Sequence, residues 1–159
     1  MKRLAALAIV GGVVLGARHA APTGDVQAGL YFPRAGPNGG IVMETLLEGP
    51  LVVRNACVEI GDPGDYTLPV WRDGFTARWE NGRVVVRNPY GDVIAVQGEN
   101  FSMGGGYIAE FRPKEKVDPK AAQLHVVTQT TGATIPSRCL DPDVYGVWWV
   151  GDTDPLRPG

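Results

Sequence analysis

Alternating apolar and polar residues dominate this chain and predict short β-strands. The clearest case runs from 75 to 88, where two alternating segments flank Asn81-Gly82. Asn-Gly is the preferred pair for a two-residue hairpin turn, because both central positions need a positive φ. The turn also sets the strand register, so that Glu80 lies directly opposite Arg83 and is expected to pair with it.

The same register divides this hairpin into two faces. The apolar face, expected in the core, consists of Phe75, Ala77, Trp79, Val84 and Val86. The polar face, expected in solvent, consists of Thr76, Arg78, Glu80, Arg83 and Arg87. A second turn at 89–92 leads into a third strand at 93–97, so the segment predicts a three-stranded meander.

Turns rich in Gly and Pro separate the remaining strand candidates. The candidate strands are 41–47, 51–60, 66–71, 75–80, 83–88, 93–97, 100–103, 107–111, 124–129 and 144–150. Strict alternation along 51–60 would turn Arg54 inward, so we expect a bulge near Asn55. Asp118-Pro119 matches an N-cap followed by a first helical residue and predicts a turn or two of helix over 119–123.

These elements predict an all-β fold. The chain has 22 Gly and 13 Pro in 159 residues, a share that favours turns and short strands over long helices. Short strands separated by frequent turns indicate a small antiparallel barrel or a sandwich of about eight strands, with at most one short helix. The early meander favours the barrel and an OB-like arrangement.

The N-terminus carries the three parts of a secretory signal in order. Lys2 and Arg3 provide positive charge, an apolar run follows over 4–15, and small residues cluster from 16 to 21. The run is shorter than the ~20 apolar residues that a membrane-spanning helix needs. We therefore expect a signal peptide over 1–20 and export to the periplasm or the medium, with an uncleaved anchor as the alternative.

One domain is expected after the signal. Residues 21–40 have no apolar period and contain three Pro and five Gly, which predicts a linker or loosely held arm. Within it, the apolar stretch 30–32 is a candidate for docking on the domain. The β-domain is expected over 41–151, followed by a polar tail over 152–159.

Charge excludes one class of partner. The signal holds Lys2, Arg3 and Arg18 and no acid, so the rest of the chain has 12 basic residues against 17 acidic ones, a net charge of −5. Nucleic acid is a poor partner for such a domain, because its phosphates require Lys and Arg. Binding to anionic lipid through charge is disfavoured for the same reason.

Two cysteines remain, Cys57 and Cys139. An even count in an exported chain suggests one disulfide, which would close a loop of about 82 residues and contribute about 4–5 kcal/mol in the chain-entropy model. Two buried free thiols are the alternative. A zinc site would need further ligands, and His125 is the only histidine outside the signal.

Catalytic patterns are weak. His125 would need a serine such as Ser102 or Ser137 and a nearby acid to form a triad, no nucleophile-elbow pattern is present, and its apolar neighbours favour an ordinary strand residue. The Gly triplet 104–106 lacks the helix and the Lys-Ser/Thr of a phosphate loop, so we interpret it as a bulge or a close backbone approach.

Carboxylates show no catalytic or metal-binding spacing either. Four scattered glutamates could in principle serve glycoside hydrolysis, but nothing pairs them: Glu59, Glu80, Glu99 and Glu110. Asp152 and Asp154 lie in the tail without the loop of an EF-hand. We expect no catalytic residue, no metal and no cofactor.

Trp148-Trp149 is the best lead for binding. Adjacent strand residues point to opposite faces, so one indole should leave the core and could stack on a sugar, a base or a partner's side chain. Cover by a loop or by the N-terminal arm is the alternative that we favour.

A pattern that covers most of the chain resembles small exported bacterial proteins of uncharacterised function. Its segments here are Leu-Val-Val-Arg-Asn-Ala-Cys (51–57), Leu-Pro-Val-Trp (68–71), Gly-Phe (74–75), the Asn-Gly hairpin, residues 91–98, the Gly triplet, Ile-Pro-Ser-Arg-Cys (135–139) and the Trp-Trp strand. The resemblance carries no activity with it. It implies that both cysteines belong to one framework, which supports their pairing.

Together these features predict an exported, non-enzymatic β-domain that has a structural role or binds an unknown protein or glycan partner. A hydrolase acting on an envelope polymer is one alternative, which two converging carboxylates in a cleft would favour. An oligosaccharide- or peptide-binding module that uses an exposed Trp is another.

Overall fold

The computed structural model describes residues 26–27, 29–35, 45–111 and 118–151. The strands are β1 (Val26–Gln27), β2 (Leu30–Tyr31), β3 (Thr45–Arg54), β4 (Cys57–Asp62), β5 (Asp65–Val70), β6 (Thr76–Glu80), β7 (Arg83–Arg87), β8 (Val93–Val96), β9 (Asn100–Glu110) and β10 (Val144–Val150). The helices are α1 (Pro119–Thr131) and the 3₁₀ turn η1 (Ser137–Cys139). The predicted signal and tail lie outside the described residues.

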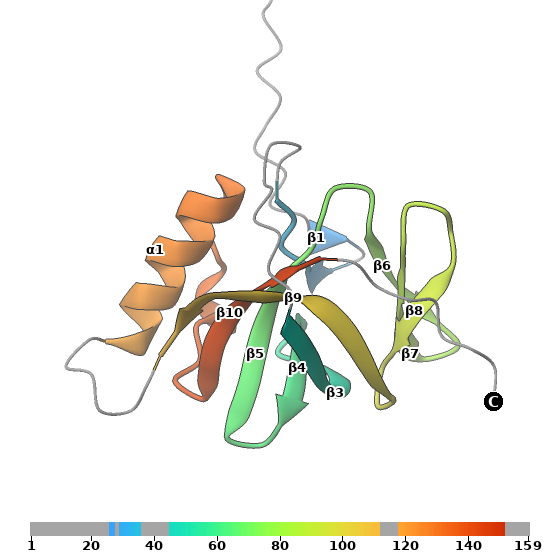
Figure 1. Ribbon diagram of the computed structural model, residues 1–159, viewed down its shortest axis with the longest axis horizontal. Helices are drawn as coiled ribbons and strands as arrows, with labels where there is room; N and C mark the ends of the chain where they lie inside the picture. Colours follow the sequence, from blue (N-terminus) through green and yellow to red (C-terminus); the bar gives the residue numbers. More distant parts are fainter. Residues whose placement is uncertain (1–25, 28, 36–44, 112–117, 152–159) are drawn as a thin grey trace, which may run out of the picture.

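Five strands form a closed barrel (Figure 1). β3 pairs with β4 and β9, β9 pairs with β10, β10 with β5, and β5 with β4, which completes the ring. The predicted all-β fold with a small barrel is confirmed. One edge corrects the antiparallel prediction: β5 and β10 run parallel, because the long connection through the meander, β9 and α1 returns the chain to the same end of the barrel.

A separate three-stranded sheet, β6–β7–β8, lies on the opposite side of the barrel from α1 (Figure 1). Its register is the one predicted from the Asn-Gly turn, with Glu80 across from Arg83. The pairing of these two charges is wrong, however. Glu80 instead accepts two hydrogen bonds from Arg87, at 3.1 and 2.9 Å, because the guanidinium fork matches a carboxylate, and Arg83 bonds to Glu99 at 2.7 Å.

Trp79 also departs from the prediction for this hairpin. The other four residues of its apolar face are buried in the core, whereas Trp79 is 49% exposed. Its partner across the hairpin, Val84, is fully buried. Trp79 differs from Val84 in that it lies on an edge strand of the sheet, whereas Val84 lies on the middle strand.

The expected single strand over 51–60 is wrong, because it contains a tight hairpin. β3 ends at Arg54 and β4 begins at Cys57, with Arg54 paired to Cys57. Asn55 and Ala56 between them have φ values of 50° and 60°, the left-handed conformation that a two-residue turn needs. Alanine rarely takes this conformation. Because neither turn residue is Gly, the sequence did not indicate a turn here. The predicted bulge near Asn55 is this reversal.

The segment after β1 packs tightly on the barrel. Leu30, Tyr31 and Phe32 are all buried, and the Tyr31 amide donates to the Ala56 carbonyl at 2.7 Å. The Phe32 ring stacks on Trp71 with centroids 4.9 Å apart. Part of the arm expected over 21–40 therefore belongs to the folded domain.

The helix is longer than predicted. Its start matches the expected cap, since the Asp118 side chain accepts from the Lys120 amide at 3.0 Å and Pro119 is the first helical residue. It then continues through the segment 124–129, which was predicted as a strand from its β-branched residues. Gly132 ends it in a left-handed C-cap, and this end signal together with the N-cap overrides the local preference for strand.

Two apolar clusters hold these layers together. The first joins barrel strands to the meander and includes Leu51, Phe101, Met103 and Trp148. The second lies between β4, β5 and β10 on one side and α1 and η1 on the other, and includes Leu68, Val127, Cys139 and Trp149. The barrel is therefore covered on two sides, by the meander and by the helix.

Candidate functional site

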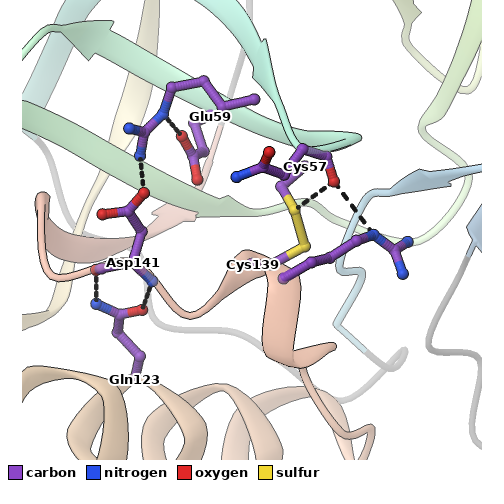
Figure 2. Close-up of a disulfide and its surroundings, with 8 residues drawn as sticks. Cys57, Glu59, Gln123, Cys139 and Asp141 are labelled. Atoms are coloured by element: carbon purple, nitrogen blue, oxygen red, sulfur yellow. Dashed lines mark hydrogen bonds and ion pairs between the residues drawn. A yellow bond between two sulfur atoms is a disulfide. The ribbon is translucent and has the colours of Figure 1, made fainter.

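Cys57 and Cys139 form a disulfide, which joins the start of β4 to η1 (Figure 2). Both cysteines are buried, with exposed fractions of 0 and 1%. The alternatives of free thiols and of a zinc site at these positions are therefore wrong. The bridge ties together segments that are 82 residues apart in the sequence.

A partly buried polar network lies beside this disulfide (Figure 2). Arg54 donates from Nε to Glu59 Oε2 at 2.6 Å, and its Nη2 lies 3.1 Å from Asp141 Oδ2 in an ion pair whose angle is poor for a hydrogen bond. Its guanidinium also stacks over the Tyr66 ring, 3.6 Å from the centroid. The Arg54 guanidinium thus contacts two carboxylates and one aromatic ring.

The network continues from Asp141 to the helix. The side-chain amide of Gln123, which is fully buried, donates to the Asp141 carbonyl at 2.6 Å and accepts from the Asp141 amide at 3.3 Å. Arg138 donates from Nε to the Asn55 carbonyl at 3.2 Å. The dashed line from the Cys57 sulfur to the same carbonyl is only a contact, since a bridged sulfur carries no hydrogen. The Gln123 bonds tie the 138–141 segment to α1, and the Arg138 bond ties it to the β3–β4 turn.

Burial and mutual pairing shift the pKa values of Glu59 and Arg54. Burial is the largest effect on the pKa of Glu59 and raises it; the hydrogen bond and charge of Arg54 lower it, the charge of Asp141 raises it, and the net pKa is above its usual value. Burial lowers the pKa of Arg54, but the bond and charge of Glu59, together with the charges of Asp141 and Tyr66, raise it overall. Because Glu59 is hydrogen-bonded and 1% exposed, the network is suited to holding the fold together and not to contacting a substrate.

Trp148 and Trp149 do point to opposite faces, yet both are buried, at 1% and 7% exposed. Trp148 belongs to the first cluster and packs edge-on against Tyr107, while Trp149 belongs to the second cluster beneath α1. The helix layer covers the indole that was expected to leave the core. Neither ring offers a surface on which a ligand could stack.

His125 is exposed on α1. The prediction from its apolar neighbours, which placed it in a strand, is therefore wrong. The four candidate glutamates are each in a structural contact: Glu59 with Arg54, Glu80 with Arg87, Glu99 with Arg83 and Glu110 with the Tyr145 hydroxyl. Asp152 and Asp154 lie outside the described residues.

The Gly triplet lies inside β9, where it lets strands approach closely. Gly105 has a φ of +151°, and a Cβ added there would overlap the Trp149 carbonyl oxygen. Gly104 accepts from the Gly151 amide at 2.8 Å. The expected role of the triplet as a close backbone approach is confirmed.

The described residues line two surface grooves that each have a volume of about 440 Å³. The first, here called the acidic groove, is open and is lined by Glu48, Gly49, Pro50, Asp62, Asn100, Phe101 and Ser102. Its two carboxylates, Glu48 and Asp62, both belong to exposed residues. Sequence reasoning did not single out either of them, because they lie in separate strands with no spacing in common.

The second groove, here called the tyrosine groove, is more enclosed. It is lined by Arg72, Asp73, Phe75, Asn88, Pro89, Tyr90 and Gly151. Tyr90 is 90% exposed, the most exposed large apolar side chain among the described residues. The sequence predicted the turn that carries it, and an aromatic residue at a turn was the signal that could have identified it.

The described part of the chain contains neither a metal-binding cluster nor a membrane-spanning helix. In residues 26–27, 29–35, 45–111 and 118–151, no three His, Cys, Asp or Glu side chains gather where a metal ion could bind. Over the same residues, no helix is long and apolar enough to cross a membrane.

Comparison with known proteins adds no relative: no protein-family model, curated protein or solved structure matches this chain. The resemblance to small exported bacterial proteins stays a prediction. The two grooves and the groups that line them are the features of the described residues that bear on function.

Proposed function

We propose that this chain is an exported, non-enzymatic β-domain that binds a partner or ligand. Its first 20 residues have the pattern of a secretory signal, and the disulfide is of the kind that persists in oxidising compartments outside the cytoplasm. The acidic balance of the remaining chain favours a ligand that is not a polyanion.

The observation that most supports a binding function is the position of the reactive groups. Among the described residues, the cysteines are bridged, the four candidate glutamates are bonded to neighbours, and His125 stands on an exposed helix face. Groups in structural contacts are poor acids, bases or nucleophiles, whereas a rigid barrel with two surface grooves is suited to binding.

Export is tested by fractionation. The full chain and a variant lacking residues 1–20 are produced in a bacterial host, and the periplasm, medium and cytoplasm are compared by immunoblot. We expect the full chain outside the cytoplasm, shortened by about the signal's length, and the truncated variant inside with reduced cysteines. Retention of the full chain in the cytoplasm would contradict export.

Absence of catalysis is tested with ester, peptide and polysaccharide substrates. We expect no turnover that scales with the purified chain. A hydrolytic activity that is lost in His125→Ala, with the circular dichroism spectrum unchanged, would overturn the proposal.

The acidic groove supports a second candidate, a hydrolase that acts on an envelope polymer. Glycoside hydrolysis uses two carboxylates, and Glu48 and Asp62 line one groove. The acid of such a pair is usually kept protonated by burial, whereas these two residues are exposed, which is why we place this candidate second. Release of reducing sugar from peptidoglycan or chitin, lost in both Glu48→Gln and Asp62→Asn, would support it.

A further inference from the structure

The turn that carries Tyr90 is held by more bonds than a strand connection needs. The Asn88 side-chain oxygen accepts from the amides of Tyr90 and Asp92 at 3.0 and 2.9 Å, and its side-chain nitrogen donates to the Asp92 carboxylate at 2.9 Å. Backbone bonds also join Asn88 to Asp92 and Gly91, at 3.0 Å each. The neighbouring hairpin closes with two residues alone, so these bonds hold the backbone of a wider turn, from which the Tyr90 side chain projects with 90% of its surface exposed.

The tyrosine groove is pre-formed because its two walls touch. Gly74, in the loop between β5 and β6, has a φ of +85°, and a Cβ added to it would lie 2.9 Å from the Pro89 ring. This contact locks the 72–75 loop against the turn between β7 and β8. Both loops lie on the same side of the molecule, at the top of Figure 1. A groove that needs no ordering loses less free energy on binding.

Behind the groove, packing is firm. Phe75 lines the floor but is only 5% exposed, and its ring packs on Trp71, with centroids 5.8 Å apart. Trp71 stacks in turn on Phe32. The apolar surface that a ligand could reach is therefore provided by Tyr90 and by the neighbouring Pro89, which are both exposed.

Polar groups of opposite charge line the same groove as Tyr90. Arg72 and Asp73 both line the groove, and Asp73 lies 4.0 Å from Arg34, a long ion pair that leaves its side chain 68% exposed. Because a cation and an anion lie side by side, the groove favours neither a polyanion nor a polycation. It offers one aromatic face together with donors and acceptors of hydrogen bonds.

We propose that the tyrosine groove binds a neutral oligosaccharide. This inference rests on the proposed binding function and names its site and ligand class. The apolar face of a pyranose ring packs on Tyr90, while Asp73 and Arg72 accept and donate hydrogen bonds to hydroxyl groups. A sugar needs only one aromatic face with polar groups beside it, which is what the groove supplies.

A peptide fits this groove less well. Peptide recognition uses an exposed sheet edge or apolar pockets that take anchor side chains, and the one apolar floor residue here is almost covered. Anionic polymers are disfavoured by Asp73 and by the net charge of −5 outside the signal. A neutral sugar remains the ligand class with the best match.

The test is titration of the purified, oxidised chain with three neutral tetrasaccharides, chitotetraose, cellotetraose and maltotetraose, followed by calorimetry and by NMR. We expect saturable binding of at least one, with shifts at the amides around Tyr90. Tyr90→Ala should weaken it about tenfold or more, as loss of a central aromatic contact does. Tyr90→Phe should retain most of it, because the ring face remains.

Trp79→Ala is the matched control, since Trp79 is also an exposed aromatic of the meander but does not line the groove. It should change affinity by no more than about twofold. If Trp79→Ala weakens binding and Tyr90→Ala does not, the assigned site is wrong.

The remaining outcomes separate the inference from the function on which it rests. Absence of binding of all three sugars at millimolar concentration overturns the ligand class. Binding of a proline-rich peptide at Tyr90 overturns the ligand class but leaves the proposed binding function standing. Hydrolysis of a bound tetrasaccharide overturns the non-enzymatic function and leaves the site intact.

Discussion

Removal of the Cys57–Cys139 bridge should cost the domain a large part of its stability. The bridge closes a loop of 82 residues. In the chain-entropy model such a loop restricts the unfolded chain by about 15 cal/mol/K, which corresponds to about 4–5 kcal/mol at 25 °C. Small domains have a net stability of about 5–15 kcal/mol, so the reduced protein should be marginally folded.

The assay is urea unfolding of the oxidised and the reduced chain, followed by tryptophan fluorescence. Since both sulfurs are buried, reduction should be carried out in denaturant before refolding under reducing conditions. With an m-value of about 2 kcal/mol/M, the midpoint should fall by about 2 M. The double variant Cys57→Ala/Cys139→Ala should behave in the same way, apart from the small loss of packing.

Arg138→Ala is the matched control for this experiment. It removes a hydrogen bond between the same segment and the Asn55 carbonyl without opening the loop. It should cost about 1 kcal/mol or less, because Arg138 is exposed. If the reduced chain unfolds within about 1 kcal/mol of the oxidised one, the bridge does not act through the unfolded state and the reasoning is refuted.

Four further predictions concern the Arg54–Glu59 pair, the Asn55-Ala56 turn and the glycine in β9. Arg54→Met should destabilise the fold by about 3–5 kcal/mol in urea unfolding, because it leaves Glu59 buried without its cation, and Glu59→Gln should cost less. Burial raises the pKa of Glu59 above 4.5, so its contribution to stability is present below pH 4.5 and is lost as the pH rises through the folded pKa. Glu59→Gln should flatten this part of the plot of unfolding free energy against pH, and an unchanged slope would contradict the assignment. Ala56→Gly should raise the free energy of unfolding by up to about 1 kcal/mol, since it relieves a left-handed alanine, and a loss of that size would show that the turn is unstrained. Gly105→Ala should prevent cooperative thermal unfolding, whereas Gly91→Ala, with open space around its Cβ, should cost only about 1 kcal/mol.

Local signals predicted the parts of this fold whose cause is local. The Asn81-Gly82 turn set the register of β6 and β7, and Asp118-Pro119 marked the start of α1, because each depends on the backbone preferences of two or three residues. The Asn55-Ala56 reversal was missed for the converse reason. Its alanine is held in place by distant contacts, the disulfide at Cys57 and the Tyr31 amide, which no local pattern contains.

Burial was harder to predict than strand order, because it depends on which layer covers which face. Alternation correctly placed Trp148 and Trp149 on opposite sides of β10, but it could not reveal that α1 covers Trp149. The same limit applies to Gln123, whose polar side chain is buried only because the Asp141 backbone lies opposite it. The exposed aromatic that matters to the proposed site, Tyr90, was placed in a turn by the sequence but was not distinguished from other turn residues.

The architecture explains why a ligand site should lie in the meander and not on the barrel. OB-like barrels bind ligands on the face of their second and third strands. Here those strands are β4 and β5, and their outer face is covered by α1, η1 and the disulfide, with Leu68 and Val127 in one apolar cluster. The β6–β8 sheet is inserted between the third and fourth barrel strands, and its far turn carries Tyr90. A covered barrel face and an exposed aromatic on the β6–β8 sheet together favour the proposed site on that sheet, and variants at Tyr90 test this separately from any change in the fold.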